Sequence, residues 1–244
     1  MSLFSQPISV FGNERISLRD WRDRFRNPSL TVLLVLQLFL MFVALPLAAI
    51  GVTLAEAVAQ SLLLVVLTVV VVLSHRRVAI VIILLGLAAD AASVVPGWRW
   101  SPMAASVLTN GGMILVFSAL TWVVVHAVFA PGRVTFHRLQ GAVIAYLSSA
   151  TIFAAIFALE WDLIPGAFAN LPDPAHGPGE FATMLYFSLA TLTTTGYGDI
   201  APLSPFARSL ANVEAVLGQF YLAITVARLV TLELEHRRSW DRRG

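Results

Sequence analysis

Long apolar runs alternate with short polar segments along most of this chain. Each run approaches or exceeds the ~20 residues that an α-helix needs to cross the apolar core of a bilayer. The gaps between the early runs are short, so we expect those helices to be antiparallel neighbours. The runs lie at 30–52, 55–74, 78–95, 103–130, 139–160 and 205–232. The pattern predicts an all-α membrane protein with six transmembrane helices.

A seventh apolar segment, residues 181–193, is too short to cross. About 13 residues of helix rise only about 20 Å, so the chain must turn back inside the membrane. Irregular backbone at that depth is tolerated only where protein buries it or water reaches it. A tight glycine turn between two spanning helices would explain neither the short helix nor the three threonines that follow Leu192. We therefore predict a re-entrant pore helix and a functional loop between helices five and six.

The loop reads Thr-Thr-Thr-Gly-Tyr-Gly-Asp over residues 193–199. Glycine reaches the left-handed backbone region without steric cost, so successive carbonyls can point the same way. Such carbonyls replace the water shell of a dehydrated cation. One loop offers too few of them, and four copies around an axis complete the cage, which predicts a cyclic homotetramer.

These residues resemble the selectivity filter of the potassium channel superfamily, and the resemblance extends over residues 138–232. It is similar to prokaryotic-type subunits with six transmembrane helices and one pore loop. Tyr186-Phe187-Ser188 resembles the aromatic pair and serine of the family's pore helix, and Gly218 falls where many members carry a hinge glycine. The resemblance implies bound K⁺ and no other cofactor. The implied ion-binding residues are Thr194, Thr195, Gly196, Tyr197 and Gly198, with K⁺ at the first four, and the implied supporting residues are Thr193, Tyr186, Phe187 and Asp199.

Two positions depart from the family pattern. Thr195 stands where valine or isoleucine is commonest, but its carbonyl matters more than its side chain, so we expect selectivity to survive. Ala190 stands where some members carry a glutamate that braces the filter aspartate. That bond is unavailable to Asp199, which leaves inactivation open.

The chain divides into four parts. Within the first part, Ile16, Leu18, Trp21 and Phe25 recur at roughly helical spacing. This favours a surface helix, although a disordered basic start that merely fixes topology would also fit. The parts are an N-terminal segment (1–28), a four-helix sensor-like bundle (29–132), a pore domain (133–238, with outer helix 139–160, pore helix 181–193, filter 194–199 and inner helix 205–238) and a tail (239–244).

Charge sets the class and the orientation. Only 12% of residues are charged, about half the fraction of a soluble domain. All sixteen basic residues are arginine, and they gather before the first run, after the second and fourth, and at the C-terminus. By the positive-inside rule both termini are cytoplasmic, in a plasma membrane. We expect partners to be lipids and further copies of the chain, and no nucleic acid.

The fourth run, residues 103–130, contains no arginine or lysine. A voltage sensor needs several such charges, because each contributes only about 2.3 kcal/mol per 100 mV. Strong voltage gating is therefore not expected. Asp90 and His126 are the ionisable candidates for modulation in this bundle, although an interfacial histidine and a neutral or hydrogen-bonded aspartate are the simpler readings.

Two residues of the predicted inner helix each have two possible roles. Gly218 is either a gating hinge or a point of close helix packing, because glycine is common in membrane helices for packing alone. Glu214, one turn earlier, is an expensive intramembrane carboxylate. It would either face the cavity or be protonated or hydrogen-bonded behind the filter, and we favour the second.

The function indicated is passive, K⁺-selective conduction without catalysis. A non-selective cation channel is the nearest alternative, because of Thr195 and the missing brace. A secondary transporter would need paired broken helices, and a silent regulatory subunit would carry no current alone. An enzyme is not indicated, since H-E-x-x-H, G-x-S-x-G and paired intramembrane aspartates do not occur.

Overall fold

The computed structural model describes residues 30–50, 77–93, 101–129, 135–171 and 178–241. Its helices are a continuous segment at 30–49, which includes the π-helical turn η1 (Leu40–Ala44) and α2 (Leu45–Ala49), followed by α4 (Arg77–Ser93), α5 (Pro102–Val128), α6 (Phe136–Leu163), α7 (Pro178–Leu192) and α8 (Pro205–Asp241). Two short strands, β1 (Phe168–Ala169) and β2 (Ala201–Pro202), complete the described elements.

Four of the described helices are long and apolar enough to cross a membrane: Leu30–Ala49, Pro102–Val128, Phe136–Leu163 and Pro205–Arg228. The predicted third helix appears as α4, whose apolar stretch Ile80–Ala89 is shorter. The predicted second helix (55–74) and the N-terminal segment (1–28) lie outside the described residues. The mostly helical fold is confirmed, while the described residues contain four spans of sufficient length rather than six.

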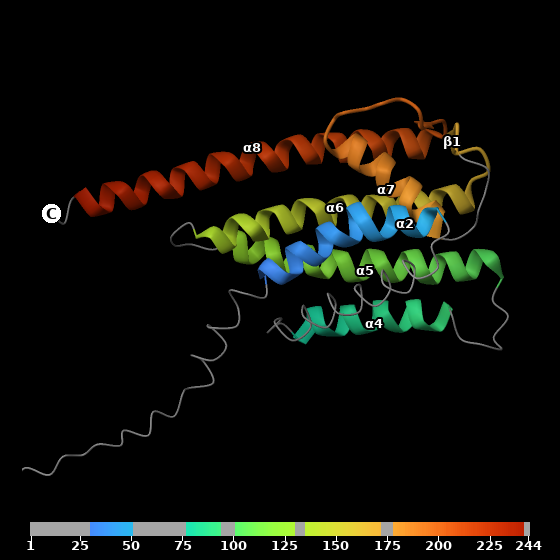
Figure 1. Ribbon diagram of the computed structural model, residues 1–244, viewed down its shortest axis with the longest axis horizontal. Helices are drawn as coiled ribbons and strands as arrows, with labels where there is room; N and C mark the ends of the chain where they lie inside the picture. Colours follow the sequence, from blue (N-terminus) through green and yellow to red (C-terminus); the bar gives the residue numbers. More distant parts are fainter. Residues whose placement is uncertain (1–29, 51–76, 94–100, 130–134, 172–177, 242–244) are drawn as a thin grey trace, which may run out of the picture.

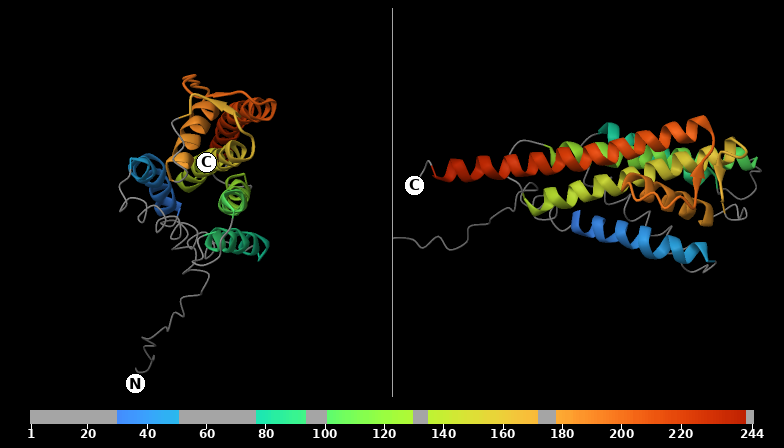
Figure 2. Two further views of the ribbon diagram at one scale, coloured as in Figure 1. Left: turned by 90° about the vertical axis from the view of Figure 1, so that its right-hand side faces the viewer. Right: turned by 90° about the horizontal axis from the view of Figure 1, so that it is seen from above.

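The helices lie side by side in a fixed order. α4 packs on α5, α5 on α6, and the short α7 is held between α6, α8 and α2 (Figures 1 and 2). α8 has 37 residues and is about 55 Å long at 1.5 Å per residue. It runs far beyond the other helices toward the C-terminus, away from the end that carries β1 (Figure 1).

Local sequence explains where the helices begin. Ser101 caps α5, since its Oγ accepts from the N–H of Ala104 at 3.2 Å, and Ser204 caps α8 through the N–H of Ala207 at 2.9 Å. Each cap is followed by a proline at the first helical position, where a missing N–H costs nothing. Pro46, in the first segment, comes just after the π-helical turn, whose widening removes the usual clash of an internal proline with the preceding turn.

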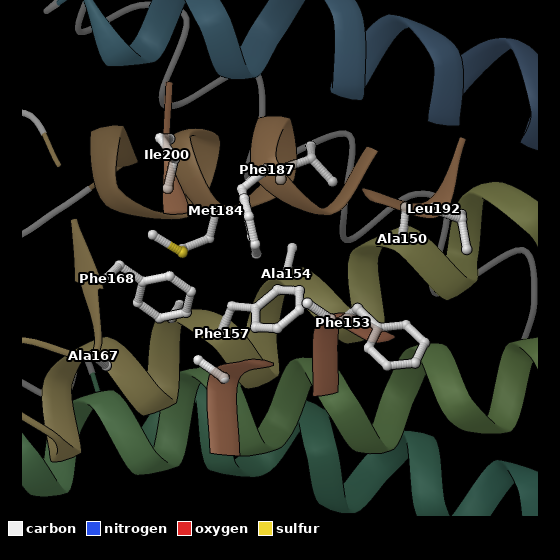
Figure 3. Close-up of a cluster of buried hydrophobic side chains, with 14 of the residues drawn as sticks. Ala150, Phe153, Ala154, Phe157, Ala167, Phe168, Met184, Phe187, Leu192 and Ile200 are labelled. Atoms are coloured by element: carbon white, nitrogen blue, oxygen red, sulfur yellow. The ribbon is translucent and has the colours of Figure 1, made fainter. Parts of the chain in front are cut away.

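An aromatic cluster joins α7 to α6. The ring of Phe187 lies 5.0 Å from Phe157 and 5.5 Å from Phe168, both edge-to-face. Figure 3 shows these rings with Met184 of α7 pointing into the layer between the two helices. Phe157 and Met184 are fully buried. Because edge-to-face pairs add about 0.5–1.5 kcal/mol each beyond their burial, this cluster fixes the pore helix against the outer helix.

The strands β1 and β2 form an antiparallel pair that the all-α prediction did not include. Phe168 pairs with Pro202, and the carbonyl of Ala167 accepts from the N–H groups of Leu203 (2.7 Å) and Ser204 (3.1 Å). Two-residue strands have no recognisable alternation of polar and apolar positions, so sequence could not reveal them. The pair ties the loop after α6 to the segment that leads from the filter into α8.

Arg228 of α8 binds the C-terminal end of α5. Arg228 donates from Nη2 to the carbonyl of Phe129 at 2.5 Å, and its guanidinium lies 5.4 Å from the centre of the Phe129 ring. Phe129 caps the C-terminus of α5, where a cation complements the helix dipole.

Candidate functional site

The loop after α7 is anchored through its own N–H groups. The carbonyl of Ala190 accepts from the N–H of Thr195 at 2.8 Å and of Gly196 at 3.1 Å, and the N–H of Thr194 bonds to the carbonyl of Thr191 at 2.9 Å. The last turn of α7 thus accepts hydrogen bonds from these three N–H groups, whose partial positive charge would otherwise repel a cation.

The backbone of the loop alternates in hand. Thr194 (φ 57°), Gly196 (φ 56°) and Gly198 (φ 77°) lie in the left-handed region, and each is separated from the next by one residue outside it. This alternation is the conformation that the sequence predicted from the two glycines. It is also what allows successive carbonyls to face one way.

Thr194 is the part of this pattern that sequence reasoning missed. A residue with a Cβ loses about 1–2 kcal/mol in the left-handed region, so a β-branched residue gives no signal for it. The structure opposes this cost with hydrogen bonds: Thr194 Oγ1 donates to the carbonyl of Thr193 at 2.7 Å and accepts from Gln219 Nε2 at 3.1 Å. Gln219 therefore connects the inner helix directly to the loop.

At the C-terminal end of the loop, Tyr186 binds Asp199. The phenol donates to Asp199 Oδ2 at 2.7 Å, and the Tyr186 ring stacks on Tyr197 at 5.9 Å between centres, with an interplanar angle of 8°. The hydrogen bond from Tyr186 is the main cause that lowers the pKa of Asp199 below its ordinary value. A glutamate at position 190 is absent, and the tyrosine supplies a donor to Asp199 in its place.

One face of α8 follows the pore helix. Glu214 lies against Ser188, with Oε1 and Oγ 2.5 Å apart. A Cβ on Gly218 would stand 2.3 Å from the carbonyl oxygen of Leu192, the last residue of α7. Tyr146 of α6 donates to the same carbonyl at 3.2 Å. The contact at Gly218 requires a residue without a side chain, which is the close-packing interpretation of this glycine.

A link between α6 and the start of α8 was not predicted from the sequence. Ser204, the cap of α8, donates from Oγ to Glu160 Oε1 at 2.6 Å, and Glu160 is buried near the end of α6. Its burial depends on how α6 and α8 are rotated, and no local pattern encodes that.

The two proposed modulators of the bundle are less closely tied to the loop. His126 is exposed on α5, where Nδ1 lies 2.9 Å from the carbonyl of Trp122 and the two rings are 4.3 Å apart. Asp90 falls in α4, and its side chain lies outside what the structure describes. Neither result assigns a role to these residues.

A cavity of about 780 Å³ opens between the start of α5, the end of α6 and the start of α7. Its polar lining includes Ser106, Asn110, Asp162 and Glu180. Asn110 donates to Ser106 Oγ at 3.1 Å, and Ser106 in turn donates to Asp162. Burial, followed by the neighbouring Asp162, raises the pKa of Glu180 to about 7. Asp162 and Glu180 are too far apart along the chain for a local pattern to predict this carboxyl pair.

A half-length helix, a loop of alternating hand and a flanking spanning helix together have the architecture of a re-entrant pore loop. Comparison with known proteins agrees with this class. Residues 141–234 match the sequence profile of a family described as "Ion channel".

Three curated relatives are potassium channels by name. The inward rectifier potassium channel Kirbac3.1 of Paramagnetospirillum magnetotacticum is 32% identical over 82 residues, which cover 34% of this chain and 25% of that protein. Two pore potassium channel c of Oryza sativa subsp. japonica is 32% identical over 92 residues, 38% of this chain and 18% of that protein. Potassium voltage-gated channel protein shk-1 of Caenorhabditis elegans is 36% identical over 63 residues, 26% and 12% respectively.

The matched segments span about a quarter or less of each relative's own length. Over residues 141–234 the chain is therefore similar to ion channels, and its long apolar helices are those of a membrane protein.

Proposed function

We propose that four copies of this chain assemble around an axis into a K⁺-selective pore that conducts passively across the plasma membrane. Each subunit contributes six transmembrane helices, with both termini on the cytoplasmic side. K⁺ is coordinated by the carbonyls of Thr194, Thr195, Gly196 and Tyr197, and by the hydroxyl of Thr194 at the inner end.

The observation that carries this proposal is the alternation of left-handed residues at Thr194, Gly196 and Gly198. The N–H groups of Thr194, Thr195 and Gly196 bond back to α7, so the carbonyls of this part of the loop are free to meet an ion. Carbonyl oxygens arranged in rings by four subunits replace the hydration shell of K⁺.

Two electrostatic features favour a cation at this place. α7 presents its C-terminus to the loop, and the dipole of a helix is equivalent to about half a negative charge there. Asp199 stands exposed at the outer end, with a pKa lowered mainly by the Tyr186 hydroxyl. A carboxylate held in its ionised form raises the local concentration of cations.

We do not expect the membrane potential to gate this channel strongly. α5 (Pro102–Val128) occupies the place of a fourth sensor helix and contains no arginine or lysine. A membrane potential therefore has no row of charges to move in this helix.

The test is reconstitution of the purified protein in planar bilayers with K⁺ on one side and Na⁺ on the other. We expect single-channel currents that reverse near the K⁺ equilibrium potential. Reversal that follows Na⁺ as closely as K⁺ would establish the non-selective cation channel instead. Slow, saturable flux without unitary currents would establish a transporter, and silence with altered current from a co-expressed channel would establish a regulatory subunit.

A mutation tests the filter directly. Gly196→Ala places a Cβ on a residue with φ 56°, and we expect it to abolish K⁺ current while tetramers remain intact. The matched control is Gly166→Ala, since Gly166 also has positive φ (76°) and open space around its Cβ, but lies in the loop after α6. Both variants bear a similar conformational cost of about 1–2 kcal/mol, so only the position differs. Normal current in Gly196→Ala would remove the filter assignment.

A further inference from the structure

Behind the loop, one buried hydroxyl joins three helices. Ser188 of α7 and Glu214 of α8 are both fully buried. The Oγ of Ser188 lies 2.5 Å from Glu214 Oε1 and 2.8 Å from the carbonyl oxygen of Ala150 in α6. The meaning of this contact for conduction rests on the function proposed above.

Ser188 cannot donate a hydrogen bond to both Glu214 and Ala150. A hydroxyl has one proton, a backbone carbonyl accepts only, and an ionised carboxylate accepts only. If Glu214 were ionised, one of these short O···O distances would hold no proton and would bring two lone pairs together. A proton on the carboxyl removes the conflict, because the chain then runs from Glu214 to Ser188 and from Ser188 to Ala150.

We infer that Glu214 is a neutral carboxylic acid that donates to Ser188 and thereby positions the pore helix. Its second oxygen, Oε2, is buried and has no hydrogen-bond partner among the described residues. An unpaired buried charge costs far more than an unpaired neutral carbonyl. The nearby ionisable side chains of α6 and α8 bring no positive charge, since Tyr146 and Tyr221 donate their hydroxyls to the backbone carbonyls of Leu192 and Ala142.

The consequence for conduction follows from where Ser188 lies. Two residues further along α7 is Ala190, whose carbonyl holds the N–H groups of Thr195 and Gly196. The relay from Glu214 through Ser188 to Ala150 fixes the rotation of α7 about its axis and so the place of that carbonyl. Glu214 acts on the ion pathway by positioning, and as a neutral acid it adds no fixed negative charge behind the filter.

The direct test is infrared spectroscopy of the full-length protein in lipid at neutral pH. All samples carry Glu180→Gln, because Glu180 is another carboxyl that is partly protonated there, with a pKa of about 7. We expect a carboxylic-acid carbonyl band that Glu214→Gln removes. The control Glu160→Gln alters a second buried glutamate, one that already accepts from Ser204, and should leave the band in place. Failure of Glu214→Gln to reduce the band would overturn the inference.

Conduction gives a second readout. Glutamine is neutral and its amide can donate to Ser188, so Glu214→Gln should keep the conductance and reversal potential of the parent protein. Glu214→Ala removes the donor and should shift the reversal potential away from that of K⁺. Reduced conductance in Glu214→Gln, as expected from loss of a fixed charge, would contradict the neutral acid. If Glu214→Gln does not fold, Ser188→Ala should shift the acid band by removing its acceptor, and an unshifted band would overturn the inference.

The two proposals fail separately. An acid band assigned to Glu214 in a protein without selective K⁺ current would reject the proposed function and keep the protonated carboxyl. Selective K⁺ current without such a band would reject the protonated carboxyl and keep the proposed function.

Discussion

The close approach of α8 to α7 at Gly218 predicts the effect of adding one methyl group there. In Gly218→Ala the new Cβ would lie 2.3 Å from the carbonyl oxygen of Leu192 and 3.0 Å from Leu192 Cδ1, whereas ordinary contacts begin at 3.4 Å. The obstacle is backbone, and Tyr146 also bonds to that carbonyl. α8 must therefore move by about 1 Å, and overpacking of this kind costs about 1–3 kcal/mol.

Gly111→Ala provides the reference, because a Cβ on Gly111 in α5 meets nothing within 4 Å among the described residues. Both substitutions gain about 0.5–1 kcal/mol from helix propensity, so the difference between the variants isolates the clash. Thermal unfolding of the purified channels should show Gly218→Ala melting below the parent and Gly111→Ala at or above it. If both variants match in stability and Gly218→Ala alters only the open probability, the close-packing argument is refuted and the hinge interpretation of Gly218 stands.

Three further outcomes follow from the site. Tyr186→Phe removes the hydroxyl that donates to Asp199. The K⁺ current should then decay faster during sustained conduction, while its reversal potential stays unchanged. An unaltered rate of decay would contradict a role of the Tyr186–Asp199 bond in holding the loop. The pKa of Glu180 is raised to about 7, so the folded protein binds the extra proton more tightly than the unfolded chain does. Its contribution to stability is therefore present at low pH and is lost as pH rises through about 7. The melting temperature should fall over that window, and a profile unchanged by Glu180→Gln would refute the assignment. Gln219→Leu removes the donor to Thr194, which should weaken K⁺ selectivity in bi-ionic recordings, whereas an unchanged reversal potential would show that the loop does not need this bond.

The local features were the predictable ones. The lengths of the apolar runs indicated the spanning helices, and the pore helix was expected at 181–193, close to the observed Pro178–Leu192. The glycines at 196 and 198 indicated left-handed backbone. Each of these depends on neighbouring residues alone: on backbone sterics, on helix rise, or on the thickness of the bilayer.

Contacts between distant residues were not predictable. Glu214 and Ser188 are separated by 26 positions, and Ser204 and Glu160 by 44. Whether such side chains meet depends on the rotation of each helix about its axis, which no local pattern records. Between α6 and α7 the aromatic layer of Phe157, Phe168 and Phe187 contributes to that orientation.

Helix rise, backbone sterics and bilayer thickness act locally, so the residue order alone indicates a helical membrane protein with a short helix and a glycine-bearing loop suited to a cation. The three-dimensional packing of the helices determines what supports that loop. It placed Tyr186 on Asp199, Gln219 on Thr194 and the Glu214–Ser188 pair behind them. The physical reason is that a buried polar group must find a partner across helix interfaces, and the packing of those interfaces selects the partner.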